Sequence, residues 1–226
     1  MSKITIQQEK TLDSEGMPEM EDSLKKGPAL SLLEQAMSNL QELGDEVKNL
    51  EEKSTAIFRL SLHDDLTGML NRKGYEQEIS KIWHIFERYG APFSLILIDI
   101  DNFKSINDTA GHRAGDKTLQ KISGKIKKVF RTVDITARYG GDELAVILPN
   151  TGIESTTISA ERLRKEVNKT NIKHQGKRLS LSISIGVATA KTGDSIATLF
   201  ERADNALYRA KNSGKNQLQL EKTEPQ

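Results

Sequence analysis

The sequence has no cysteine among its 226 residues, which excludes disulfide bonds, thiolate nucleophiles and zinc sites built on cysteine. It also lacks any apolar run of the ~20 residues that a membrane-spanning helix needs. The first residues show no apolar core of a signal peptide, so we expect a cytoplasmic protein without direct membrane insertion. The net charge of +1 provides no broad electrostatic field, and we therefore expect no nucleic-acid partner.

Three parts follow one another along the chain. Residues 1–28 are polar and acidic without a sustained apolar period, which predicts a disordered tail. Residues 29–59 carry apolar side chains at alternating steps of three and four, as the helices of a coiled coil do. Residues 60–222 alternate between helical and strand-like patterns, and they predict a single domain of the α+β class.

The heptad pattern predicts a helix that pairs with a second copy of the chain. Its seam consists of Leu33, Ala36, Leu40, Leu43, Val47, Leu50, Ser54 and Ile57. The alternative is an amphipathic helix that lies on its own domain, but the narrow apolar stripe favours the coiled coil. Gly44 and Ser54 weaken the pattern, so we expect a marginal or switchable dimer.

The α+β domain begins with a nearly continuous apolar run at residues 93–100 (FSLILIDI), which is typical of a buried strand. Two alternating runs flank Gly140 and Gly141, which predicts a tight hairpin with both glycines at positive φ. Helices are predicted over residues 74–89, 114–130, 154–168 and 195–212, and strands over residues 135–139, 144–148, 179–189 and 216–220. This βαββαβ order, with an added helix and edge strand, predicts a ferredoxin-like sheet whose helices pack on one face and leave the other open for a ligand.

Two acidic clusters stand at the ends of predicted strands. Asp99 and Asp101 close the apolar run, and Asp142 and Glu143 follow the glycine pair directly. Either cluster alone is ordinarily a solvated loop or a plain hairpin. If the hairpin lies beside the first strand, the carboxylates converge, and hard oxygen ligands of this kind suit Mg²⁺ together with nucleotide phosphates.

The motif at residues 138–144 (RYGGDEL) resembles the defining motif of the GGDEF family of diguanylate cyclases. Residues 64–72, 99–104, 107–116 and 203–216 resemble further motifs of that family, in the same order along the chain. The resemblance covers about residues 61–220 and implies a palm-like nucleotidyl cyclase fold. The family motif ends in phenylalanine where this chain has Leu144, which keeps the position apolar with some loss of volume.

The resemblance also implies a reaction. A homodimer would condense two GTP into cyclic di-GMP and two pyrophosphates, with Mg²⁺ or alternatively Mn²⁺ as cofactor. Asp99, the Ile100 carbonyl, Asp142 and Glu143 would be metal ligands. Asp142 and Glu143 would also be catalytic, Asp142 by promoting deprotonation of the ribose 3′-hydroxyl.

The remaining implied roles concern binding. Asn107 and Asp116, with His112, would recognise guanine, since an amide and a carboxylate match its edge. Residues implied to contact the rest of the substrate are Asn102, Phe103, Lys104, Gly140, Gly141, Lys211 and Lys215. Arg131 and Asp134, with Arg162, resemble the family's site for inhibition by cyclic di-GMP, against the alternative of a simple surface ion pair.

Three other functions stay open at this point. A degenerate homologue would bind GTP or cyclic di-GMP without turnover, although such proteins usually lose an acid at the position of Asp99, Asp142 or Glu143. A scaffold that acts through its coiled coil would not need the nucleotide-binding residues in register. A cyclase for adenine nucleotides is disfavoured because Asn107 and Asp116 suit guanine.

Overall fold

The computed structural model describes residues 27–60, 62–174 and 177–222. The predicted tail at residues 1–28 therefore lies almost entirely outside the described residues. The chain divides into two compact units, residues 1–58 and residues 59–226. Across the described residues, no helix combines the length and apolar character needed to cross a membrane.

The first unit contains one long helix, α2, which runs from Pro28 to Leu60 and confirms the predicted helix. The described apolar side chains of the seam from Leu33 to Leu50 are solvent-accessible, with Val47 53% and Leu40 68% exposed. The side chains of Ser54 and Ile57 lie outside the described ones. A helix with such a stripe of exposed leucine and valine has apolar surface that a partner helix can bury.

The second unit is built on a five-stranded sheet with the strand order β2-β3-β1-β6-β7. Its strands are β1 (Phe93–Ile100), β2 (Ile135–Arg138), β3 (Glu143–Pro149), β6 (Ile183–Thr189) and β7 (Leu218–Leu220). The first four pair in antiparallel fashion, and β7 joins β6 in parallel at the edge. The predicted α+β class with a ferredoxin-like sheet is confirmed.

The strand predicted over residues 179–189 is in fact two strands. Residues Lys177–Ser180 form β5, which pairs with β4 (Asn171–His174) in a separate small sheet, while β6 belongs to the main sheet. Apolar residues alternate through the break, with Leu181 buried between the two strands. The period-two pattern therefore continues across a change of sheet and cannot reveal it.

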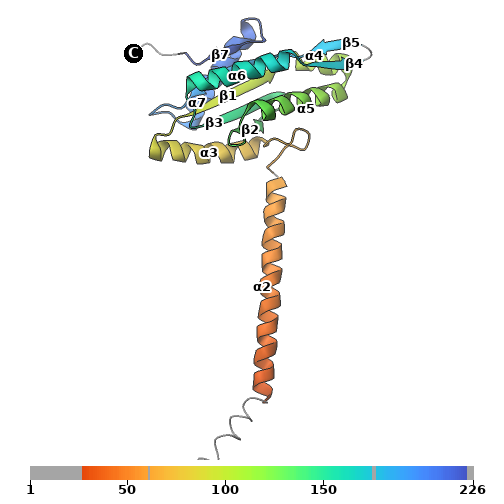
Figure 1. The fold of residues 1–226 in the computed structure, drawn as a ribbon, viewed down its shortest axis with the longest axis vertical. Helices are drawn as coiled ribbons and strands as arrows, with labels where there is room; N and C mark the ends of the chain where they lie inside the picture. The colour runs from red at the N-terminus through yellow and green to blue at the C-terminus, as the bar shows by residue number, and fades with distance from the viewer. Residues whose placement is uncertain (1–26, 61, 175–176, 223–226) are drawn as a thin grey trace, which may run out of the picture. The chain divides into compact units, whose positions relative to one another are not determined.

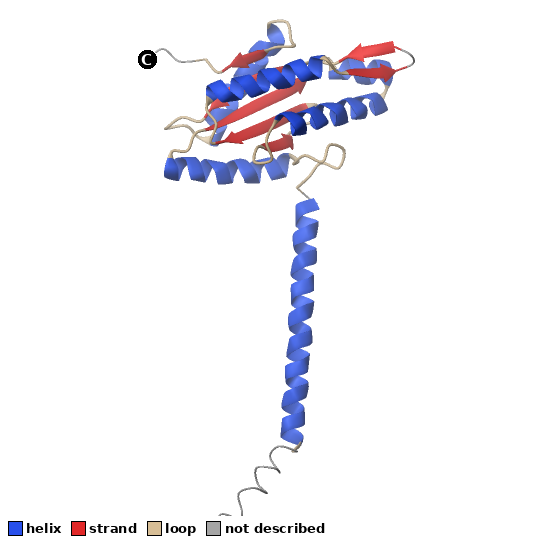
Figure 2. Ribbon diagram, viewed as in Figure 1, coloured by secondary structure: helices blue, strands red, loops and turns tan. Residues whose placement is uncertain are grey.

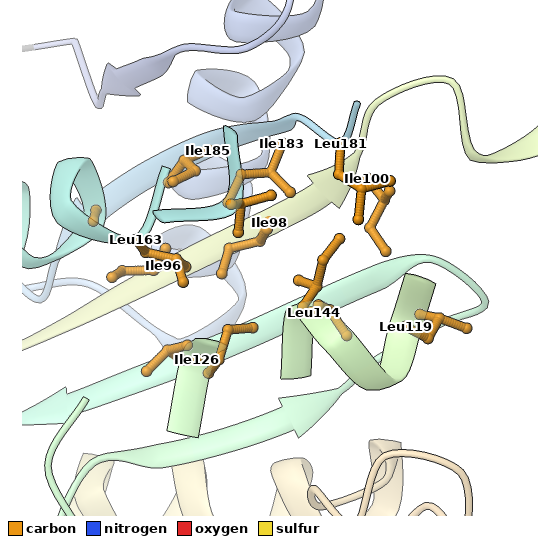
Figure 3. Packing of buried hydrophobic residues seen from close by; sticks show 14 of the residues in the cluster. Ile96, Ile98, Ile100, Leu119, Ile126, Leu144, Leu163, Leu181, Ile183 and Ile185 are labelled. Carbon is orange, nitrogen blue, oxygen red and sulfur yellow. The ribbon is translucent and has the colours of Figure 1, made fainter. Parts of the chain in front are cut away.

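Helices cover both faces of the sheet, so the predicted open face is wrong. They are α3 (Arg72–Tyr89), α4 (Phe103–Ala110), α5 (His112–Val129), α6 (Ile153–Asn168) and α7 (Ile196–Asn212). One core cluster joins Ile96 and Ile98 of β1 to α5 and α6, which lie along the same face (Figures 1 and 3). The other cluster joins Leu95 and Leu97 to α3 and α7, so the strands lie between helices (Figure 2). A strand that is apolar on both sides must be covered on both sides.

The packing of α7 on β6 depends on Gly186. A Cβ atom at this position would lie 2.2 Å from the Ala203 carbonyl oxygen and 2.3 Å from the Leu207 amide nitrogen, both backbone atoms of α7. We expect Gly186→Ala to lower the free energy of unfolding by about 3 kcal/mol, because a backbone cannot yield as a side chain does. Urea denaturation measures this difference.

The matched control is Gly124→Ala in α5, where an added Cβ meets nothing within 4 Å. Alanine favours the helix, so this variant should be more stable than the wild type by up to about 1 kcal/mol. Equal unfolding midpoints for the two variants would contradict the close approach of α7 to β6.

Candidate active site

The two predicted acidic clusters meet at one edge of the sheet. Asp99, near the end of β1, stands directly opposite Glu143, the first residue of β3. Asp142 precedes Glu143 at the end of the loop that joins β2 to β3. The pKa of Asp99 is raised, mainly by burial and also by the nearby charges of Asp142 and Asp101. The hydrogen bond from Lys211 lowers this pKa but does not cancel the increase. The carboxylates of neighbouring strands therefore lie within electrostatic reach of one another.

Lys211 is the cation that this acidic edge already holds. It lies in the last turn of α7, and its Nζ is 2.6 Å from Oδ2 of Asp99. The Asp99 side chain is only 13% exposed, and a carboxylate so buried requires a positive partner. Lys211 was predicted to contact the substrate, but this ion pair, which joins residues 112 positions apart, was not predicted.

Asp101 belongs to the motif at residues 99–104, although no role was predicted for it. It connects the end of β1 to neighbouring segments through hydrogen bonds. It is 5% exposed and accepts hydrogen bonds from the Ser184 hydroxyl (2.6 Å) and the Asn216 amide (2.9 Å). Lys215, beside Asn216, donates to Oδ1 of Asn102 at 2.6 Å. The segment after α7 is thus attached to the end of β1 and to the start of α4.

The loop between β2 and β3 differs from the predicted tight turn. Residues 139–142 separate the strands, and neither Gly140 nor Gly141 has a positive φ. Instead, the amides of Tyr139 and Gly140 both donate to the Glu143 carbonyl. A Cβ on Gly140 would lie 2.6 Å from Oε2 of Glu143, so the Glu143 carboxylate lies against the backbone of Gly140 and would move aside for a larger residue.

Arg138 attaches this loop to Asp64 through an ion pair that was not predicted from the sequence. Arg138 donates to Oδ2 of Asp64 at 2.9 Å and to the Gly141 carbonyl at 2.8 and 3.1 Å. Asp64 also accepts from the amide and hydroxyl of Thr67. Burial alone would raise the pKa of Asp64, but the bonds from Thr67 and Arg138 together lower it. The Asp-x-x-Thr spacing permits the bonds between Asp64 and Thr67, but no sequence pattern indicated the ion pair with Arg138.

We expect Asp64→Asn to lower the free energy of unfolding near neutral pH by about 2 kcal/mol, since the charge-assisted bond to Arg138 is lost. The folded-state pKa of Asp64 is lowered, so its contribution is present above the unfolded pKa and is lost as pH falls through the folded pKa. The gap between wild type and variant should therefore close below a pH of about 4.

Urea titrations at several pH values provide the measurement. Glu78→Gln is the control, because it removes an exposed ion pair with Lys81 and should cost less than about 0.5 kcal/mol. A deficit of Asp64→Asn that persists unchanged in acid would show that the charge of Asp64 is not its cause.

The residues predicted to recognise guanine come together where α4 packs on α5. A Cβ on Gly115 would lie 2.0 Å from Oδ1 of Asn107, so the Asn107 amide lies over the α5 backbone beside exposed Asp116. His112, also exposed, is one turn earlier on α5. Lys104 is exposed in the first turn of α4, which begins at Phe103. The close approach of the Asn107 side chain to Gly115 was not predicted.

The predicted inhibitory residues also lie close together. Arg131 and Asp134 occupy the turn between α5 and β2, where the Asp134 carboxylate accepts from the Arg131 backbone amide at 2.7 Å. Arg162 of α6 donates to the Val129 carbonyl at 2.6 Å, which brings it to the same turn. The side chains of Arg131 and Arg162 are both exposed. Within the described residues, neither forms an ion pair with a carboxylate.

Comparison with known proteins agrees with this arrangement. Residues 61–217 match the model of the family described as "Diguanylate cyclase, GGDEF domain". The chain is 35% identical over 194 residues to diguanylate cyclase DgcP of Pseudomonas aeruginosa, covering 83% of this chain and 29% of DgcP. It is 40% identical over 162 residues to the response regulator PleD of Caulobacter vibrioides, covering 70% of this chain and 36% of PleD. The chain thus spans about a third of the length of these relatives.

A solved structure shows the same fold. The coiled coil and GGDEF domain of DgcB from Caulobacter crescentus, in complex with c-di-GMP, superimposes with a TM-score of 0.76 at 31% identity. The match covers 82% of this chain and 98% of that one. On the family match and these identities, the chain belongs to the GGDEF family of diguanylate cyclases.

Proposed function

We propose that this chain condenses two GTP into cyclic di-GMP and two pyrophosphates. The observation that carries the proposal is the single edge of the sheet at which Asp142 and Lys211 both lie within electrostatic reach of Asp99. Its relative DgcP is named a diguanylate cyclase, and the DgcB structure holds the product. All three acids whose loss marks a degenerate homologue, at positions 99, 142 and 143, are present.

The residues fit a divalent cation, Mg²⁺ or alternatively Mn²⁺. Asp99, Asp142, Glu143 and the Ile100 carbonyl would supply hard oxygen ligands. The described residues contain no ready-made cluster of three acids or histidines that could hold a metal, and phosphate oxygens of the nucleotide and water would complete the shell. A bound cation would polarise the attacked phosphate and lower the pKa of the attacking hydroxyl.

The substrate contacts follow from the same edge. Asn107, Asp116 and His112 would read the guanine ring at the junction of α4 and α5. The backbone at Asn102 and Phe103 and the side chains of Lys104, Lys211 and Lys215 would hold the triphosphate. Gly140 and Gly141 carry no side chain that would stand between the nucleotide and the loop.

The reaction requires two subunits, because each site binds one GTP. The ribose 3′-oxygen of one nucleotide forms a bond to the α-phosphorus of the other, while the bond from that phosphorus to pyrophosphate breaks. Asp142 would promote removal of the hydroxyl proton, and Lys211 and Lys215 would offset charge on the leaving group. The exposed seam of α2 would hold the two catalytic domains at high effective concentration.

Incubation of the purified chain with Mg²⁺ and either GTP or ATP tests the proposal. Chromatography should reveal cyclic di-GMP and pyrophosphate from GTP, and unchanged ATP. Tight binding of GTP without any product would instead identify a binding module, and a cyclic adenine nucleotide would contradict the roles of Asn107 and Asp116.

We further propose that cyclic di-GMP inhibits the enzyme at Arg131, Asp134 and Arg162. Two exposed arginine side chains at one turn can bind a phosphate or a guanine edge with paired hydrogen bonds. Arg131→Ala should therefore keep the initial rate and weaken inhibition by added product about tenfold or more. Retained inhibition in a folded Arg131→Ala variant would place the inhibitory site elsewhere.

A further inference from the structure

A cavity of about 630 Å³ lies between α3 and α7, beside the loop that carries Asp142. Its size falls in the range of about 300–1,000 Å³ typical of small-molecule sites. Its aromatic walls include Tyr75, Tyr139 and Phe200. None of the proposed substrate or product contacts lines it, so it is separate from the site described above.

The aromatic walls form a continuous group. The ring centroids of Tyr75 and Tyr139 are 5.2 Å apart at 81°, and those of Tyr139 and Phe200 are 5.1 Å apart. Tyr75 is only 3% exposed, yet its hydroxyl has no hydrogen-bond partner among the described residues. A buried hydroxyl without a partner costs about 1–3 kcal/mol, which a polar group of a ligand can offset.

Acidic side chains lie beside these rings. Three carboxylates line the cavity, on Glu76, Glu201 and Asp204. Glu76 pairs with Arg72 at 3.0 Å, whereas exposed Glu201 and Asp204 form no ion pair with any described residue. The cavity therefore has two acidic groups that form no ion pair within the part of the chain that the structure describes.

The ring of Tyr139 already accepts a cation. The Arg72 guanidinium lies 4.9 Å from its centroid, in cation–π contact. At the N-terminus of α7 the amides of Ser195 and Thr198 are satisfied within a capping box. Arg72 balances the charge of Glu76, so the unpaired carboxylates of Glu201 and Asp204 are what favour a positively charged ligand over a negative one.

We propose that this cavity binds an organic cation, namely a protonated amine on an aromatic or apolar body. The amine would lie near Glu201 and Asp204, and the apolar body against Tyr75, Tyr139 and Phe200. Tyr139 directly precedes Gly140 in the loop that carries Asp142, so a ligand in the cavity would contact this loop. This binding goes beyond the proposed cyclase reaction and does not require turnover.

Calorimetry of the full chain with three matched probes tests the proposal. The probes are 2-phenylethylamine, 2-phenylethanol and 3-phenylpropionate, which carry a positive, neutral and negative head on a similar body. The amine should bind about tenfold more tightly than the alcohol, and the acid more weakly than either. Equal affinities, or no binding of any probe, would overturn the proposal.

Variants locate the binding. A double variant, Glu201→Gln with Asp204→Asn, should lower the affinity for the amine to that for the alcohol, since only the charges change. Ala197→Phe, which fills the cavity from its exposed rim, should abolish binding of both. Glu154→Gln, an exposed acid on α6, is the control. Circular dichroism verifies folding, and an amine preference that survives the double variant would refute the site.

Discussion

Asp142→Asn is expected to lower the rate of cyclic di-GMP formation by about 10³-fold, because asparagine keeps the size of the side chain but removes its charge and its capacity to accept a proton. The fold does not depend on this carboxylate, since it forms no hydrogen bond or ion pair with the described residues. Its loss also removes a negative charge close to Asp99. The variant should therefore be at least as stable as the wild type and keep its oligomeric state.

Initial rates at saturating GTP and Mg²⁺, together with urea denaturation, measure both expectations. Asp45→Asn is the matched control, because Asp45 is exposed on α2 at a heptad position outside the seam. Turnover close to that of the wild type in Asp142→Asn would remove this residue from the chemistry. A lost activity accompanied by unfolding would contradict the view that the carboxylate serves only catalysis.

Leu40→Glu combined with Leu43→Glu should reduce the rate per subunit about 10²-fold or more at micromolar concentrations. Both leucines belong to the exposed seam of α2, at 68% and 56% exposure, and charges there oppose pairing of two helices. Without the paired helices, catalytic domains meet only by diffusion, and the advantage of effective concentration, about 10²–10⁴, is lost.

Light scattering and the dependence of rate on protein concentration test this account. The double variant should be monomeric, with a rate per subunit that rises with concentration. The control variant, Ser38→Glu with Gln41→Glu, adds the same charge at exposed positions outside the seam and should behave as the wild type. If the leucine variant remains as active and as dimeric as the control, the α2 seam does not assemble the enzyme.

Helices and strands could be predicted from the sequence where only one kind of structure explains the pattern of apolar residues. The uninterrupted apolar run of β1 identified a buried strand, and the heptads identified α2. The same run also signalled cover on both faces, which the predicted one-sided packing overlooked. The pattern failed between β5 and β6, since alternation carries no information on which sheet a strand joins.

The candidate site was partly predictable for a similar reason. Acids at strand ends indicated a shared edge, and the register of Asp99 opposite Glu143 confirms that the two strands are neighbours. The pairs Lys211–Asp99 and Arg138–Asp64 join residues 112 and 74 positions apart. Such contacts depend on how helices and loops pack, and no local spacing encodes them. The left-handed turn predicted at Gly140 and Gly141 is also absent, since neither glycine has a positive φ.

The proposed reaction depends on Asp99 and Asp142, which together would bind a divalent cation with the phosphates of GTP. Electron paramagnetic resonance of Mn²⁺ in the presence of 3′-deoxyGTP, which lacks the attacking hydroxyl, measures this binding without turnover. The account predicts that Asp99→Asn and Asp142→Asn each weaken Mn²⁺ binding about tenfold or more, while Asp45→Asn leaves it unchanged. Unaltered Mn²⁺ affinity in both acidic-site variants would contradict it.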